Sequence, residues 1–271
     1  PPLGNASVNE AGVCMMLITT HQTRPVMSFP LLPQPSVKTA DHCAIREVFL
    51  SSECSEQVCE RFDELITHTV RIAKGAELYH AGVNARYLYF VRSGSFKTVL
   101  VGEQGFSLVT GFPMSAEPIG LEAITGEPHV CSAVALEDSE VYMISYQRLE
   151  QLAREVPSLR LSLSRMLSRE ITQGQSRLYT LWHYNAEERL AIFMLGLSKR
   201  FAQRGYSAHR FLLRMSREDI ALSIGVRSET ICRAIARLRE MSLMAVEGRS
   251  VEIMDLPLLK ALCQRGQTPE S

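Results

Sequence analysis

A seam of apolar residues limits the possible folds of this chain more than any other feature of its sequence. Its six members recur at steps of 4, 4, 3, 4 and 3 residues, which is the spacing of one stripe along an α-helix. A helix from Leu159 to Tyr184 would be about 39 Å long at roughly 1.5 Å per residue. The seam predicts pairing with an identical helix, and packing on the chain's own domain is the alternative. It consists of Leu163, Leu167, Ile171, Gly174, Leu178 and Leu181.

The stretch before this helix has the pattern of many short β-strands. Over residues 69–146, short apolar runs alternate with turns that contain glycine. Strands at such regular spacing predict a sandwich, a barrel or a roll. A short helix is expected over 55–67. Residues 1–41 contain several prolines and no steady period, so a disordered arm is expected there.

After the seam, the sequence predicts helices joined by a tight turn. One helix is expected over 185–203, and Ser216 is a good N-cap for the next, because acidic residues follow it. Gly225 supplies the turn, since glycine adopts positive φ without strain. A further helix is expected from near Ser228, with aliphatic residues facing inward. This order fits a helix-turn-helix, and residues 244–254 are expected to form a two-stranded wing.

The outer side of the last of these helices has the residues expected to contact DNA. Residues 205–250 include eight Arg, no Lys and five acidic residues, which is a local excess of positive charge. Arginine suits bidentate contacts to phosphate and guanine, and a recognition helix presents its N-terminal residues to base edges. A solvated face with a Glu–Arg pair four residues apart is the alternative. The candidate DNA-binding residues are Arg217, Arg227, Ser228, Glu229, Cys232, Arg233 and Arg237.

Composition narrows the class of protein. Hydrophobic residues make up 46% of the 271 residues, enough for sizeable cores. No run reaches the roughly 18 consecutive apolar residues of a membrane span, and no secretory signal is visible. Seven scattered cysteines do not form the even framework of a secreted disulfide protein. A cytoplasmic protein is therefore expected, and the lack of a P-loop, a G-x-S-x-G motif or a nucleophile–base pair gives no support to an enzyme.

A roll followed by a long helix and a winged helix-turn-helix resembles the Crp/Fnr family of bacterial regulators, and within it the Fnr branch. The resemblance covers roughly residues 42–256. It is strongest over 185–191 and 198–205, and residues 228–233 match the Fnr-type recognition helix V-E-T-I-S-R at four of six positions. Residues 87–94 add support from the roll.

The resemblance implies an α+β fold, which with the expected disordered N-terminal arm (1–41) gives four parts. A cyclic-nucleotide-binding-like β-roll (42–150) follows the arm. A long dimerisation helix (151–184) and a C-terminal winged helix-turn-helix (185–271) follow. Such a protein would bind double-stranded DNA as a homodimer and contact RNA polymerase.

The resemblance also assigns roles on the recognition helix. In Fnr-type members, a Glu, a Ser and an Arg of that helix read a half-site resembling TTGAT. Glu229 and Arg233 match two of these base readers, whereas Cys232 replaces the Ser. A thiol is a weak hydrogen-bond donor, so any contact that Cys232 makes would differ from that of the Ser.

The chain departs from the Fnr branch at the iron–sulfur ligands. Such sensors hold a cluster with three N-terminal cysteines and one cysteine of the roll. These positions fall here on Ala40, Cys43, Phe49 and Tyr142, so only Cys43 remains. No iron–sulfur cofactor is therefore expected, and a rearranged cluster is the alternative. Its ligands would be Cys43, Cys54, Cys59 and Cys131.

The chain also departs from the members that bind cyclic nucleotides. Their Arg-Ser-Ala triplet reads Cys131-Ser132-Ala133 here, and a buried phosphate without that arginine is costly. The main hypothesis is a DNA-binding regulator without a recognisable cofactor. The second is a redox or gas sensor with a non-standard cysteine or haem site. The histidines considered for haem, but expected at the surface or in hydrogen bonds, are His42, His68, His80 and His129.

Overall fold

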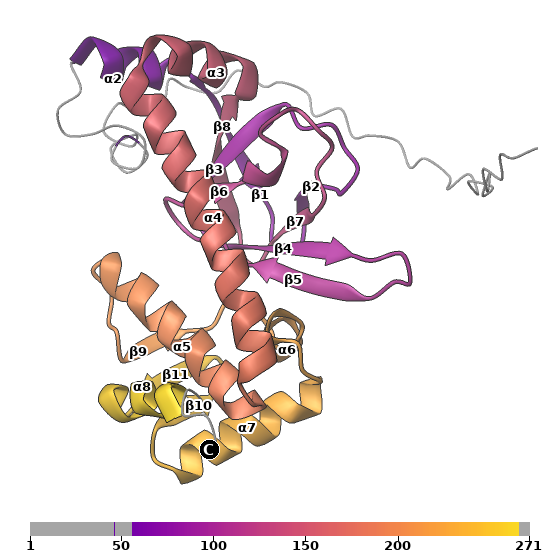
Figure 1. Cartoon of the computed structure of the whole chain (residues 1–271), viewed down its shortest axis with the longest axis vertical. Coiled ribbons are helices and arrows are strands. Elements are labelled where there is room, and N and C mark those ends of the chain that lie inside the picture. The colour runs from indigo at the N-terminus through magenta and orange to yellow at the C-terminus, as the bar shows by residue number, and fades with distance from the viewer. Residues whose placement is uncertain (1–45, 47–55, 266–271) are drawn as a thin grey trace, which may run out of the picture. The chain divides into compact units, whose positions relative to one another are not determined.

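A computed structural model describes residue 46 and residues 56–265 of the chain (Figure 1). The expected arm over 1–41 lies outside the described residues, and so do His42, Cys43 and Cys54. The described residues form a part rich in β-strands, a long helix and a C-terminal part in which helices pack with a small sheet.

The first part is a roll of two four-stranded antiparallel sheets, which is one of the three architectures that the strand pattern allowed and the one that the resemblance implied. One sheet has the strand order β1-β8-β3-β6 and the other has the order β2-β7-β4-β5. The flanking helices are α2 (Glu56–Asp63) and α3 (Tyr146–Glu155), and the 3-10 turn η2 (Leu121–Ala123) follows β6. The strands are β1 (Ile66–Ile72), β2 (Glu77–Tyr79), β3 (Tyr87–Ser93), β4 (Phe96–Val101), β5 (Ser107–Gly111), β6 (Pro118–Ile119), β7 (Ser132–Ala135) and β8 (Ser139–Ser145).

Alternating side chains form the core of the roll. In β3, Leu88 and Phe90 are fully buried while the residues before each are half-buried, as expected where successive side chains point to opposite faces. The turn after β3 requires glycine at Gly94, where φ is +87°. A Cβ there would lie 2.1 Å from the Ser139 hydroxyl oxygen. The close approach of this turn to β8 therefore depends on the missing side chain.

Two boundaries differ from those predicted. The helix expected over 55–67 ends at Asp63, because Ile66 instead starts β1 and pairs with Ile144 of β8. The dimerisation helix was placed from 151, which lies inside α3. The chain breaks at Val156, whose backbone is extended, and Pro157 starts the next helix. Proline suits the first position of a helix, where its missing N–H is not needed.

Helix α4 (Pro157–His183) contains 27 residues and has two different halves. In the first half, Leu159 and Met166 are buried against the roll, and Leu163 and Leu167 are half-buried on the same cluster. In the second half, Ile171 and Leu178 of the seam are exposed, whereas Leu181 near the end of the helix is half-buried. At roughly 1.5 Å per residue, the helix is about 40 Å long, as predicted.

The C-terminal part contains the predicted helices and a three-stranded sheet. The sheet order is β10-β11-β9, so a third strand joins the two predicted strands of the wing. The core includes the fully buried Leu190, Met194, Ile220 and Leu238. The elements are α5 (Ala186–Gln203), β9 (Arg210–Leu212), α6 (Arg217–Ile224), α7 (Ser228–Glu240), β10 (Met244–Glu247), β11 (Ser250–Ile253) and α8 (Leu256–Arg265).

Candidate nucleic-acid interface

The start of α6 and the turn after it depend on Ser216 and Gly225, which the sequence analysis named, and on Asp219, one of the acidic residues that follow Ser216. The Ser216 hydroxyl accepts from the backbone N–H of Asp219 at 3.0 Å. The Asp219 carboxylate accepts from the backbone N–H of Ser216 at 2.9 Å, which completes a capping box. Gly225 ends α6 with φ at +66°. A residue with a Cβ would be strained there, so the turn into α7 depends on this glycine.

Helix α7 has one buried face and one exposed face. Ile231 and Leu238 are fully buried and Ile235 is nearly so, which confirms the predicted inward face. All seven predicted DNA-binding residues are exposed. Arg217 begins α6, Arg227 is the N-cap of α7, and the other five lie on α7. The surface is therefore accessible to a ligand, and its contact with DNA stays a prediction.

The two predicted base readers do not pair with each other. Within the part of the chain that the structure describes, neither Glu229 nor Arg233 forms an ion pair, although they lie four residues apart on one helix. Arg233 Nη2 donates to the hydroxyl of Thr230 at 3.4 Å. The alternative of an ordinary Glu–Arg pair is thus not formed, and both charged groups are available to a partner.

Other residues of this face interact locally. Arg217 Nη1 lies 3.6 Å from Cys232 Sγ, which brings the first turn of α6 beside the outer face of α7. Arg237 pairs with Glu240 at 3.1 Å, and both side chains are exposed, so this ion pair adds little stability. A hollow between α7 and β10 lies next to Cys232 and is lined by Ala236, Arg239 and Val246 among others.

Arg189 supports the turn before α7, and the sequence analysis missed this role. Its Nε donates to the carbonyl of Tyr184 at 2.8 Å, and its Nη2 donates to the carbonyl of Leu181 at the end of α4. Its Nη1 lies 3.4 Å from the carbonyl oxygens of Ile224 and Gly225. One guanidinium thereby links the end of α4 to the helix-turn-helix. Residue spacing gave no signal for it, because the partners are backbone oxygens brought together only by the fold.

The seam of α4 is divided between two surroundings. Leu163 and Leu167 pack on the roll of their own chain, and a Cβ at Gly225 would lie 2.8 Å from Leu181 Cδ2. In contrast, Ile171 is 63% exposed and Leu178 is 60% exposed. A Cβ at Gly174 would meet nothing within 4 Å. Packing on the chain's own domains therefore accounts for half of the seam, while the other half has no cover among the described residues.

The roll positions to which the resemblance assigns effector ligands have other side chains here. Tyr142, at the position of the fourth iron–sulfur ligand, is buried in the hydrophobic core of the roll. Cys59 is half-buried against the same hydrophobic core. Cys131 is buried, with its sulfur 3.7 Å from the hydroxyl oxygen of Thr110. Burial raises the pKa of the Cys131 thiol, which is therefore neutral. Within the described residues, no three His, Cys, Asp or Glu side chains form a group able to hold a metal ion.

His129 belongs to a buried polar cluster close to Cys131. Its ring stacks on that of Tyr79 with 3.7 Å between centroids, and its Nδ1 lies 3.0 Å from Glu122 Oε1. The Tyr79 hydroxyl donates to the same oxygen at 3.4 Å, and burial raises the pKa of Tyr79 well above its ordinary range. His80 pairs with Glu77 near the surface, and His68 is exposed on β1. These three histidines thus lie at the surface or in hydrogen bonds, as expected.

Comparison with known proteins covers most of the chain. Residues 69–156 match the cyclic nucleotide-binding domain family, and residues 188–262 match the Crp-like helix-turn-helix domain family. "Transcriptional regulatory protein btr" of Bordetella pertussis is 38% identical over 228 residues, which cover 84% of this chain and 94% of that protein. The "Fumarate and nitrate reduction regulatory protein" of Vibrio cholerae is 38% identical over 213 residues, covering 79% and 85% respectively.

A solved structure shows the same arrangement of elements. FixK2 from Bradyrhizobium japonicum is 26% identical, with a TM-score of 0.67, and the match covers 72% of this chain and 96% of that one. Along the described ranges, no helix combines the length and apolar character that crossing a membrane requires. Because relatives at 38% identity are matched over most of their length, the chain belongs to the Crp/Fnr family of DNA-binding transcriptional regulators.

Proposed function

We propose that the chain regulates transcription as a homodimer that reads a palindromic, TTGAT-like DNA site, without an iron–sulfur cluster or a cyclic nucleotide. The observation that carries the proposal is the exposed outer face of α7, where Glu229 and Arg233 are not engaged in ion pairs with described residues. An arginine can hold guanine O6 and N7, and a glutamate can accept from cytosine N4. These are the two bases of the G·C pair in the proposed half-site.

The second half of α4 supports the homodimer. Ile171 and Leu178 are exposed, and Trp182 near the end of the helix is 83% exposed. Apolar side chains in a row on one helix gain roughly 25 cal/mol per Å² when an identical helix covers them. In a dimer with two-fold symmetry, the two recognition helices would enter half-sites about one helical turn apart, roughly 34 Å.

The residues at the family's iron–sulfur and phosphate-binding positions support a protein without the family's usual effectors. One of the four cluster ligands of Fnr-type sensors, Cys43, is present. The neutral thiol of Cys131 stands where a phosphate-binding arginine would be required, and Glu122 places a carboxylate close by. A phosphate ligand would therefore meet the Glu122 carboxylate, and the arginine that neutralises the phosphate in cyclic-nucleotide-binding members is replaced by Cys131. RNA polymerase is proposed as a partner from the family resemblance alone.

Binding of the full chain to defined DNA tests the proposed function. Protein purified with and without oxygen is titrated against a palindrome of two TTGAT half-sites, one half-site alone and a scrambled duplex, with iron and sulfide measured in each sample. We expect two chains per palindrome, equal affinity in both preparations, and no change when a cyclic nucleotide is added. Equal binding to the scrambled duplex would contradict sequence-specific reading. Stoichiometric iron with affinity that depends on oxygen would instead support a sensor with a rearranged cluster.

A further inference from the structure

Strand β4 of the roll contacts the first helix of the helix-turn-helix. Lys97 Nζ donates to Asp219 Oδ1 at 2.5 Å, and the two side chains are 26% and 8% exposed. The other oxygen of Asp219 accepts from the backbone N–H of Ser216 at 2.9 Å and from its hydroxyl at 2.7 Å. Asp219 therefore caps α6 with one oxygen and binds the roll with the other.

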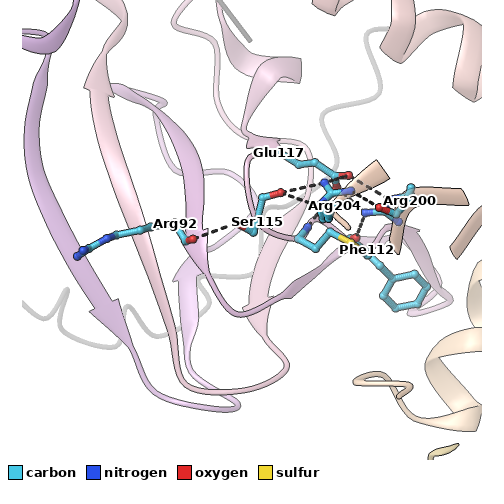
Figure 2. A network of polar contacts seen from close by, with 7 residues as sticks. Arg92, Phe112, Ser115, Glu117, Arg200 and Arg204 are labelled. Carbon is cyan, nitrogen blue, oxygen red and sulfur yellow. Dashed lines mark hydrogen bonds and ion pairs between the residues drawn. The ribbon is translucent and has the colours of Figure 1, made fainter. Parts of the chain in front are cut away.

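A second polar contact joins the roll to α5. Glu117, just before β6, accepts from Arg200 Nε at 3.0 Å and from Arg204 Nη2 at 2.7 Å, and a further bond from Arg200 reaches its other oxygen. Arg200 also donates to the carbonyl of Phe112 at 2.6 Å, and Arg204 donates to that of Ser115 at 2.8 Å. Figure 2 shows both guanidinium groups meeting the carboxylate and the carbonyls of this one loop. Two cations are thus fixed against one segment of the roll.

Apolar contacts lie between the same elements. The ring of Phe112 packs edge-on against Phe193 of α5, with 5.7 Å between centroids. Val109, Met114 and Leu136 of the roll are buried in the same cluster as the core of the DNA-binding part. Apolar burial holds the two parts together but has no preferred direction. Hydrogen bonds do depend on direction, so the two polar contacts, which engage two different helices, favour one orientation of the DNA-binding part relative to the roll.

These contacts leave the outer face of α7 exposed. They engage α5 and the first turn of α6, whereas Glu229, Cys232 and Arg233 of α7 are exposed. Because α7 packs on the same core as α5 and α6, a roll that holds these two helices also sets the direction of α7. The contact therefore fits positioning of the recognition helix, and not its masking.

We propose that Lys97 and Glu117 are positioning residues for DNA recognition, which hold the helix-turn-helix in the orientation that lets both recognition helices of a dimer enter one palindrome. This inference rests on the proposed function. When either contact is lost, the DNA-binding part occupies the competent orientation only a fraction of the time. The apparent affinity for two half-sites then falls by that fraction.

Full-length Lys97→Met and Glu117→Gln test the inference, with the palindrome and a single half-site as probes. A single half-site needs only one recognition helix, so its affinity does not depend on the mutual orientation of two. We expect each variant to lose about tenfold in affinity for the palindrome, if the competent fraction falls to about a tenth, and much less for the single half-site. Lys97→Arg should retain palindrome affinity, and Lys74→Met, at an exposed lysine of the roll, is the matched control.

The outcomes separate this inference from the proposed function. Unchanged affinity of both variants for the palindrome would overturn the positioning role, and tighter binding would show an inhibitory contact instead. An equal loss on both probes would indicate general damage to the fold and would also overturn it. If the wild-type chain does not prefer the palindrome over scrambled DNA, the proposed function itself fails, whatever the variants do.

Discussion

Asp219 shows how far single residues can be interpreted from sequence. The spacing of Ser216 and the acidic residues after it predicted a helix start, and the capping box confirms it. The contact with Lys97 was not predictable, because 122 residues separate the two and no local pattern relates them. Similarly, the sequence identified the outer face of α7 from periodicity, but it did not identify Arg189, whose partners are carbonyl oxygens of distant elements.

The ionisation of Asp219 should be visible in acid. Burial alone would raise the pKa of Asp219, but hydrogen bonds from Lys97 and Ser216 outweigh it and hold the pKa below its ordinary value. A carboxyl whose folded pKa is depressed contributes stability above its unfolded pKa and loses it as the pH falls through the folded pKa. We therefore expect Asp219→Asn to be less stable than wild type at neutral pH, with a difference that shrinks on acidification. Thermal unfolding between pH 7 and pH 3 measures this, and a constant difference would contradict it.

Arg233 should discriminate bases and not simply attract phosphate. Arg233→Ala removes a bidentate contact to guanine, so we expect a loss of roughly 1–3 kcal/mol on the TTGAT palindrome and relaxed preference at that G·C pair. Competition against palindromes changed at this pair alone provides the measurement. Arg154→Ala, at an exposed arginine of α3 that pairs with Glu150, is the control. A uniform loss on all sequences would assign Arg233 to the phosphate backbone.

Among the elements, those with caps were predicted best. Asn185, Ser216 and Gly225 mark helix ends that the structure places as expected. The sequence analysis missed the break at Val156, since the apolar spacing continues through it, and it did not assign β9 to the wing sheet. The break had a local signal that periodicity does not register, since Pro157 disfavours a helical Val156 before it. The place of β9 depends on a tertiary contact, its pairing with β11, which no local pattern contains.

Two glycines, one in the turn between α6 and α7 and one in α5, test how backbone conformation affects stability. Gly225 has φ at +66°, and a Cβ there would crowd Leu181, whereas a Cβ at Gly196 in the exposed middle of α5 would meet nothing within 4 Å. We expect Gly225→Ala to destabilise the protein by about 1–2 kcal/mol, because a left-handed backbone is strained with a side chain. Gly196→Ala should stabilise it by up to about 1 kcal/mol, because alanine favours the helix. Denaturant unfolding measures both, and equal signs would refute the argument.

At the scale of the whole molecule, the seam of α4 is divided between packed ends and an exposed middle. Its ends pack on the roll and on the helix-turn-helix of the same chain, so the helix connects the two functional parts. Its middle, with Ile171 and Leu178, is exposed. The sequence predicted the helix and the stripe but could not divide the stripe, because apolar residues that meet their own chain and those that meet another copy have the same spacing.

The exposed middle of α4 predicts a dimer that forms in air without any added ligand. Gly174 lies between Ile171 and Leu178, and a Cβ there would meet nothing within 4 Å, so in a dimer its missing side chain would let two backbones approach. Gly174→Asp would bring two carboxylates face to face across the two-fold axis, and their repulsion would be poorly screened in a covered seam. We expect this variant to shift towards monomer and to lose affinity for the palindrome more than for one half-site. Gly196→Asp, the same change at an exposed helical position, controls for helix propensity. Sedimentation at micromolar concentration measures the state, and a wild-type monomer, or equal effects of the two substitutions, would show that α4 is not the dimer interface.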